Sequence, residues 1–213
     1  MLYKSQRLVT ASVLLSLVCG QAFAADTIDA ADTGFMIICT GLVLMMTLPG
    51  LALFYSGMVR KKHVLAVMAQ SAAATALVSI LWVAAAYSLT FSGDGAYLGN
   101  LARLFLTGIG LETVSPLAKT IPELLFMAYQ MTFAVITCAL VGGAVADRMK
   151  FSAFLLFCTL WLFLVYFPIA HMVWYWAGPD AIAEAAKALV DAGTDAAAKA
   201  AAQTKLDSVL ADA

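Results

Sequence analysis

Hydrophobic positions along the chain fall into four long runs, and every charged position between Gly34 and Trp176 lies in a break between them. A helix needs about 20 apolar residues to cross a hydrocarbon core of about 30 Å, and each run exceeds that length. Because a backbone in lipid must satisfy its own hydrogen bonds, we expect each run to be a helix. The predicted spans are Phe35–Val59, Val64–Phe91, Leu124–Ala146 and Phe151–Trp176.

This pattern predicts an all-α fold, a polytopic transmembrane helix bundle that occupies residues 25–176. Composition agrees, since 63% of the residues are hydrophobic and only 12% are charged, which lies outside the range of soluble domains. The formal net charge of −1 argues against a nucleic-acid partner.

The first 24 residues have the pattern of a secretory signal peptide. Lys4 and Arg7 form a short basic region, and the apolar stretch Leu8–Val18 is too short to span a membrane. The segment Ala22–Ala24 supplies the pattern of two small residues separated by one residue that precedes a predicted cleavage point after Ala24. An uncleaved anchor is the alternative. A signal peptide implies a bacterial-type export route and a mature N-terminus outside the cytoplasm.

The breaks between the runs differ in charge, which predicts the orientation of the bundle. Arg60–His63 and Asp147–Lys150 are short and basic, whereas the longer break at residues 92–123 has no basic excess. Short loops rich in Lys and Arg stay in the cytoplasm. We therefore expect the first helix to run from outside to inside, in a bacterial inner membrane. This direction agrees with the signal peptide.

The C-terminal part of the chain, residues 177–213, changes character abruptly. It is rich in alanine, and its Asp and Lys residues are spaced as on a solvated helix. It is not apolar enough to span a bilayer. We interpret it as a helical extracytoplasmic loop, with helices over Asp180–Ala192 and Asp195–Ala211, inside which the chain stops.

Candidate functional residues within the spans are aromatic rather than charged. Tyr129 and Phe133 fall on one face of the third span, and Phe133 lies too deep for an interfacial belt. It either packs in the bundle or blocks a pore, and packing is the commoner case. Trp174 and Trp176 end the fourth span, where interface anchors are common.

The cysteines that remain after signal cleavage predict neither a disulfide framework nor a metal site. All three lie inside the predicted spans, and their number is odd. We interpret Cys39, Cys138 and Cys158 as small packing residues. The sequence therefore predicts no catalytic residue, no metal site and no cofactor.

Three motifs in the spans carry a family resemblance. The first span ends in TLPGLALFYSGMVR, from Thr47 to Arg60. The third contains QMTFAVIT, which starts at Gln130, and closes with GAVADR, which starts at Gly143. The fourth closes with PIAHMVW, which starts at Pro168. In order, spacing and topology these motifs resemble the ammonium transporter family (Amt/Mep/Rh), from Phe35 to about Trp176.

The resemblance implies a trimer in which each subunit has its own narrow hydrophobic pore through eleven helices, of which this chain matches the first four. It implies an outer vestibule where Trp174 and Phe133, with Tyr129 beside them, attract ammonium by cation–π contacts. A cation within about 6 Å of such a ring gains about 0.5–2 kcal/mol. A cytoplasmic PII-type regulatory protein is an implied partner. Family positions that line the pore match Leu51, Leu140, Tyr166 and Val173.

The chain departs from the family pattern at the pore histidines. In the family two facing histidines come from the fifth and tenth helices, with an acidic residue early in the fifth, and this sequence holds none of them. Its own histidines, His63 and His171, are predicted on opposite sides of the membrane. We therefore expect an ammonium transporter sequence, present as an N-terminal fragment that is inactive alone.

Other functional classes are weighed against this expectation. The alternative is a non-transporting membrane subunit or sensor that associates with the full-length transporter. The placement of the histidines argues against an electron-transfer bundle. A membrane enzyme is disfavoured because the spans contain no acid, base or nucleophile pair.

Overall fold

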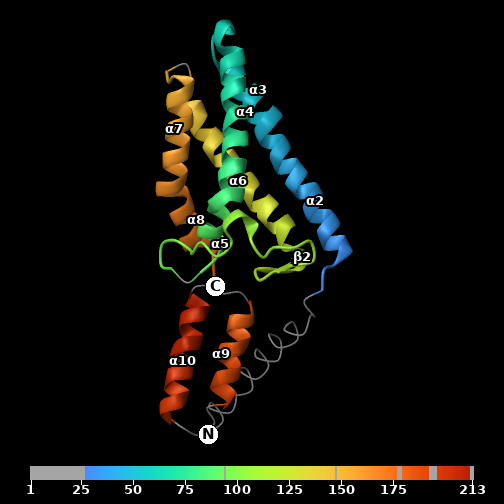
Figure 1. Cartoon of the computed structure of the whole chain (residues 1–213), viewed down its shortest axis with the longest axis vertical. Coiled ribbons are helices and arrows are strands. Elements are labelled where there is room, and N and C mark those ends of the chain that lie inside the picture. Colours follow the sequence, from blue (N-terminus) through green and yellow to red (C-terminus); the bar gives the residue numbers. More distant parts are fainter. Residues whose placement is uncertain (1–26, 94, 147, 177–178, 192–195, 212–213) are drawn as a thin grey trace, which may run out of the picture. The chain divides into compact units, whose positions relative to one another are not determined.

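The computed structural model describes residues 27–93, 95–146, 148–176, 179–191 and 196–211. Within it, Ile28–Tyr175 forms one compact unit that contains four long helices (Figure 1). A second unit includes α9 (Pro179–Asp191) and α10 (Ala196–Ala211), which pack against each other. The predicted signal peptide, residues 1–24, lies outside the described residues.

The first long helix begins at Ala30 rather than at the predicted Phe35. Asp29 caps it, because its carboxylate accepts a hydrogen bond of 2.9 Å from the backbone N–H of Asp32. The helix consists of α2 (Ala30–Met45), a π-helical turn (Met46–Leu51) and α3 (Ala52–Met58). Pro49 lies inside the π-helical turn. Proline has no backbone N–H to donate, so the wider turn accommodates it within a continuous helix.

The other long helices confirm the predicted fold and adjust its boundaries. The second consists of a 3₁₀ turn (Lys61–His63), α4 (Val64–Leu81), a π-helical turn (Trp82–Ala86) and α5 (Tyr87–Phe91). The third is the unbroken α6 (Glu123–Ala144). The fourth consists of α7 (Phe151–Trp161), a π-helical turn (Leu162–Tyr166) and α8 (Phe167–Trp174). All four are long and apolar enough to cross a membrane.

A small β-hairpin, which the sequence pattern did not predict, lies between the second and third long helices. Its strands β1 (Val114–Ser115) and β2 (Ala118–Pro122) pair antiparallel. The backbone N–H of Asp29 donates a 2.8 Å hydrogen bond to the carbonyl of Thr120, which ties the start of the first helix to β2. Strands this short carry almost no alternation of polar and apolar residues, and therefore no readable signal.

The core of the four-helix unit is aromatic, and α4 and α5 lie at its centre. α4 packs against α3, α6 and α7, and α5 packs against α8. The Trp82 indole is fully buried and donates a hydrogen bond of 3.1 Å to the backbone carbonyl of Met127. The rings around the Trp82 indole meet it edge-to-face or tilted, and such geometries favour specific packing. The rings that pack in this core are Trp82, Tyr87, Phe91, Phe126 and Phe167.

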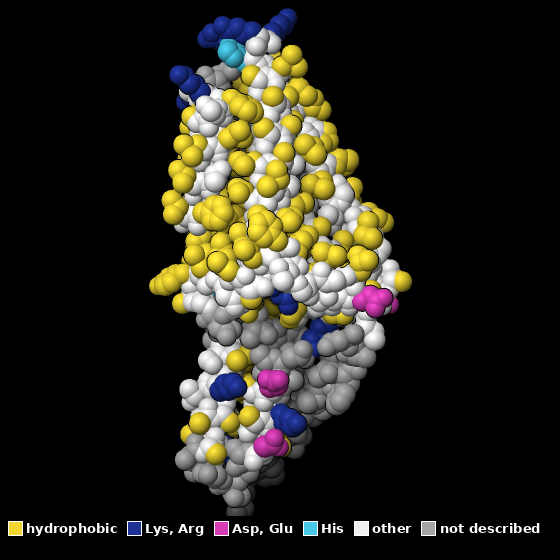
Figure 2. All heavy atoms as spheres, in the orientation of Figure 1, with side chains coloured by type: hydrophobic (Ala, Val, Ile, Leu, Met, Phe, Trp, Pro, Cys, Tyr) yellow, Lys and Arg dark blue, Asp and Glu magenta, His cyan; other side chains and the backbone are white. Residues whose placement is uncertain are grey.

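Large hydrophobic side chains also cover much of the outside of the four-helix unit (Figure 2). Lys and Arg side chains gather at one end of this unit, beside a histidine. The basic segment that precedes α4, Arg60–His63, is exposed or half-buried. An apolar belt that ends in a basic tip is the surface expected for helices that face lipid and end in a basic loop.

Candidate functional site

The candidate site begins on α6, where Tyr129 and Phe133 stand one turn apart. Their ring centroids are 5.0 Å apart and their planes meet at 86°. Residues at positions i and i+4 of a regular helix are neighbours on one face. Because α6 has no irregular turn, the spacing in the sequence translates directly into this contact.

The last turn of α8 brings Trp174 to the same place. The centroids of Phe133 and Trp174 are 6.0 Å apart, and the ring planes meet at 68°. Tyr166, at the end of the π-helical turn before α8, lies 6.5 Å from Trp174. We call Tyr129, Phe133, Tyr166 and Trp174 the ring cluster. The structure thus brings together the three residues predicted to recruit ammonium and one predicted to line the pore.

Burial increases across the ring cluster. Trp174 is 41% exposed, whereas Tyr166 is only 9% exposed. Tyr129 and Phe133 are intermediate. Trp174 is therefore the member of the ring cluster that is most open to solvent. This gradient is suited to an ion that exchanges part of its hydration for contacts with rings.

The two histidines lie at opposite ends of the second long helix and do not face each other. His63 belongs to the turn that starts this helix, whereas His171 contacts its far end. The two ring nitrogens of His171 lie 2.8 Å from the carbonyl oxygen of Thr90 and 2.7 Å from that of Gly95. The intervening helix corresponds to about 40 Å at 1.5 Å per residue. His171 fastens α8 to the segment that follows α5.

Comparison with known proteins decides the family. Residues 34–198 match the family model described as Ammonium Transporter Family. This match covers more than half of the chain and includes the whole ring cluster. The chain belongs to the ammonium transporter family.

Relatives in this family come from bacteria, archaea and fungi. An ammonium transporter of Bacillus subtilis is 50% identical over 143 residues, which are 67% of this chain and 35% of the relative. A putative ammonium transporter of Methanothermobacter thermautotrophicus is 45% identical over 147 residues, or 69% of this chain and 36% of the relative. The chain thus spans about a third of the length of these relatives.

Solved structures agree with the sequence comparison. The crystal structure of Candida albicans Mep2 superposes with a TM-score of 0.62 at 36% sequence identity. The superposition covers 69% of this chain and 32% of the Mep2 chain. The bundle is therefore part of the ammonium-transporter fold, and the relatives are transporters rather than enzymes.

The four positions predicted to line a pore are only partly enclosed by the described helices. Tyr166 is buried in the ring cluster, and Leu51 is half-buried. Leu140 and Val173 are 47% and 67% exposed. Two of the four predicted positions are therefore open on the surface of the described helices.

A charge pair with one buried partner, at the start of α6, was not predicted from the sequence. Glu123, the first residue of α6, is 2% exposed and forms an ion pair with Arg103. Its carboxylate also accepts a hydrogen bond of 2.9 Å from the hydroxyl of Tyr87 on α5. In the sequence both charged residues lie in the long break at residues 92–123, where they were interpreted as loop residues. An acid directly before an apolar run was the one available signal, because helix N-termini favour acids.

Among the described residues, no group of three or more His, Cys, Asp or Glu is placed to hold a metal ion. Cys138 and Cys158 are buried in the core, and both are free thiols. The chemistry that the candidate site offers is therefore that of aromatic faces.

Proposed function

We propose that this chain forms the outer, ammonium-recruiting part of an ammonium transporter. One observation carries the proposal: the ring planes of Phe133 and Trp174 meet at 68° with centroids 6.0 Å apart, and Trp174 is 41% exposed. Membership of the ammonium transporter family supports the choice of ion. Transport through the membrane, the role of Tyr129 and the pore-lining role of Leu51, Leu140, Tyr166 and Val173 are parts of the same proposal.

The ring geometry limits where the ion can sit. Rings in edge-to-face contact leave no room for a cation between them. Their planes instead form an open angle, and a cation in that angle lies over both faces within the range of about 6 Å that cation–π attraction requires. Each contact is worth about 0.5–2 kcal/mol, so binding is weak. Weak binding without a carboxylate lets an ion leave the site as readily as it enters.

The test uses tryptophan side chains as reporters. We expect methylammonium to shift the ¹⁹F signal of Trp174 in protein labelled with 5-fluorotryptophan in detergent, at millimolar or higher concentration. The Trp174→Phe variant assigns the signal. The Phe133→Leu variant should reduce the shift by half or more, since it removes one of the two ring faces.

Trp82 provides the internal control, because it is fully buried and its indole N–H is already hydrogen-bonded. Its signal should not move during the titration. The proposal fails if sodium chloride at equal ionic strength shifts the Trp174 signal as much as methylammonium does, or if the Trp82 and Trp174 signals move together.

We also propose the orientation of the bundle, in a bacterial inner membrane, from the charge of its loops. The basic segment Arg60–His63 and the basic residues Arg148 and Lys150 would face the cytoplasm. The ring cluster and residues 177–213 would then face outside. Reporter fusions after Lys62 and after Gly110 should report opposite compartments, and the same compartment for both would refute this topology.

The assembly of the complete transporter is proposed on family resemblance. We propose a homotrimer with a PII-type regulatory protein at its cytoplasmic face. The first long helix supports lateral packing against other helices, because large apolar side chains such as Phe35, Ile38 and Phe54 are more than half exposed on it.

A further inference from the structure

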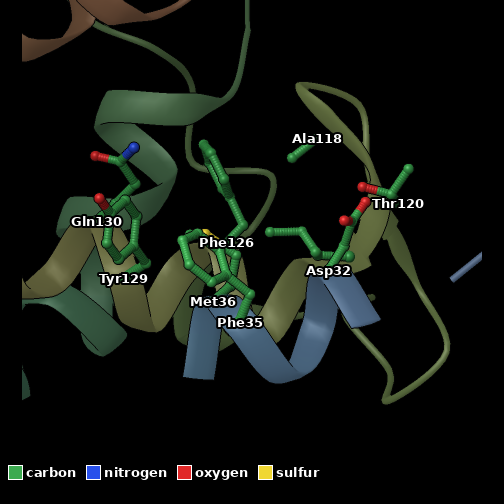
Figure 3. Close-up of a pocket in the computed structure, with 9 residues that line it drawn as sticks. Asp32, Phe35, Met36, Ala118, Thr120, Phe126, Tyr129 and Gln130 are labelled. Atoms are coloured by element: carbon green, nitrogen blue, oxygen red, sulfur yellow. The ribbon is translucent and has the colours of Figure 1, made fainter. Parts of the chain in front are cut away.

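A pocket of about 310 Å³ lies beside the ring cluster, between α2, β2 and α6 (Figure 3). Its volume falls within the range of small-molecule sites. In Figure 3, Asp32 and Thr120 lie at one end, with Tyr129 and Gln130 at the other. Its lining consists of Asp32, Phe35, Met36, Ala118, Thr120, Ile121, Phe126, Tyr129 and Gln130.

The charge in this pocket is negative and confined to one end. The Asp32 side chain points toward Thr120 (Figure 3). Lys119, which lies between Ala118 and Thr120 on β2, is not among the residues that line the pocket. Asp32 is thus the charged side chain among the lining residues.

A second polar group marks the opposite end. The side-chain oxygen of Gln130 is buried and has no hydrogen-bond partner among the described residues. A buried acceptor without a donor costs about 1–3 kcal/mol, and in Figure 3 the Gln130 amide points away from Phe126 and Met36. Between the two polar ends the lining is apolar and aromatic, with Met36 and Phe126 at its middle.

We infer that this pocket binds an organic ammonium ion with a small apolar body. The ammonium group would pair with the Asp32 carboxylate, and the apolar body would lie against Phe126 and Met36. Ammonium itself is a poor fit, because an ion the size of a water molecule fills only about 30 Å³. An arylalkylamine matches the carboxylate, the rings and the volume together.

This site is distinct from the proposed ammonium site, although Tyr129 belongs to both. Trp174 does not line the pocket, and Asp32 is not part of the ring cluster. The inference does not depend on ammonium recruitment at Trp174. Through Tyr129, which packs on Phe133 at 5.0 Å, an amine in the pocket would touch the edge of the ring cluster.

The test is a ¹⁹F NMR titration of the 213-residue chain with 4-fluorobenzylamine in dodecyl maltoside, a detergent without charge or amine. We expect saturable binding that Asp32→Asn weakens roughly three- to tenfold, as for a charge pair that is partly open to solvent. The neutral 4-fluorobenzyl alcohol should bind more weakly by a similar factor. Asp32→Glu should retain most of the binding, because it keeps the charge.

Two variants make the test specific. Glu112→Gln removes a carboxylate from an exposed position outside the pocket, and it should leave the affinity unchanged. Trp174→Leu removes the proposed ammonium site and should also leave it unchanged. Equal affinity in wild type and Asp32→Asn, with helical circular dichroism retained, overturns the inference. So does binding that is lost in Trp174→Leu but kept in Asp32→Asn, which would place the amine on the ring cluster.

Discussion

At the scale of single residues, a glycine sets how closely two of the long helices approach. A Cβ atom built on Gly143 of α6 would overlap the ring of Tyr55 on α3. The same tyrosine donates a hydrogen bond of 3.3 Å from its hydroxyl to the backbone carbonyl of Leu140. Tyr55 thus packs closely against α6, and the absence of a side chain at Gly143 makes that contact possible.

We predict that Gly143→Ala destabilises the bundle by about 1–3 kcal/mol, because the added methyl group displaces the Tyr55 ring. The measurement is the midpoint of unfolding in mixed detergent. Gly41→Ala is the matched control: Gly41 lies within α2 with nothing near its Cβ position. That change should stabilise slightly, by about 0.5–1 kcal/mol, since Gly is a poor helix residue. Equal effects of both substitutions would rule out the steric explanation.

The candidate residues differ in how far the sequence could predict their positions. Tyr129 and Phe133 lie on one regular helix, so their contact follows from spacing alone. Trp174 stands in another helix, and only the family resemblance linked it to Phe133. Glu123 and Arg103 are 20 residues apart, with the β-hairpin between them, and no local pattern encodes such a contact.

At the scale of elements, the π-helical turns explain what periodicity could not predict. Each π-helical turn adds a residue to the helix, which rotates the following side chains by about 100° relative to a regular helix. The four spans and their order followed from hydropathy. The helix faces that come after the π-helical turns could not be predicted from hydropathy. Only one of these turns contains a proline, Pro49, that could mark its position. The turn at Leu162–Tyr166 precedes α8 and thereby sets the direction of Trp174.

The buried charge pair fixes a second element, the segment that joins α5 to the β-hairpin. Arg103 of this segment pairs with Glu123, which also binds Tyr87 of α5. We predict that Glu123→Gln destabilises the protein by about 1–3 kcal/mol and speeds amide hydrogen exchange around Arg103. The glutamine keeps an acceptor for Tyr87 but leaves the guanidinium without its counter-charge.

Glu112→Gln is the control for this prediction, because Glu112 is an exposed carboxylate of the same connecting region. It should leave both the unfolding midpoint and the exchange rates unchanged. If exchange around Arg103 is equally slow in Glu123→Gln, the ion pair does not hold this segment in place.

At the scale of the whole molecule, the described helices combine an organised cluster of aromatic rings at one end with exposed apolar faces. The ring cluster is assembled from α6, α8 and the turn before α8 without any further helix. Leu140 and Val173, which are predicted to line a pore, are 47% and 67% exposed. The ring nitrogens of His171 lie within hydrogen-bond distance of two backbone carbonyls at the end of its helix. We therefore expect ammonium recruitment and conduction to make different demands on the fold.

We predict that residues 1–213, expressed alone, do not conduct ammonium. Because the predicted pore-lining residues Leu140 and Val173 are about half exposed or more, the four helices alone would not enclose a continuous path for the ion. Their apolar faces would pack against lipid. The measurement is methylammonium uptake at low pH, where little neutral base crosses the bilayer, in cells that lack their own ammonium transporters. Uptake above the empty-vector level that is lost in Trp174→Ala would show that four helices suffice, for instance as an oligomer. Altered uptake on co-expression with a full-length transporter would instead favour a modulating subunit, whose apolar faces bind the complete protein.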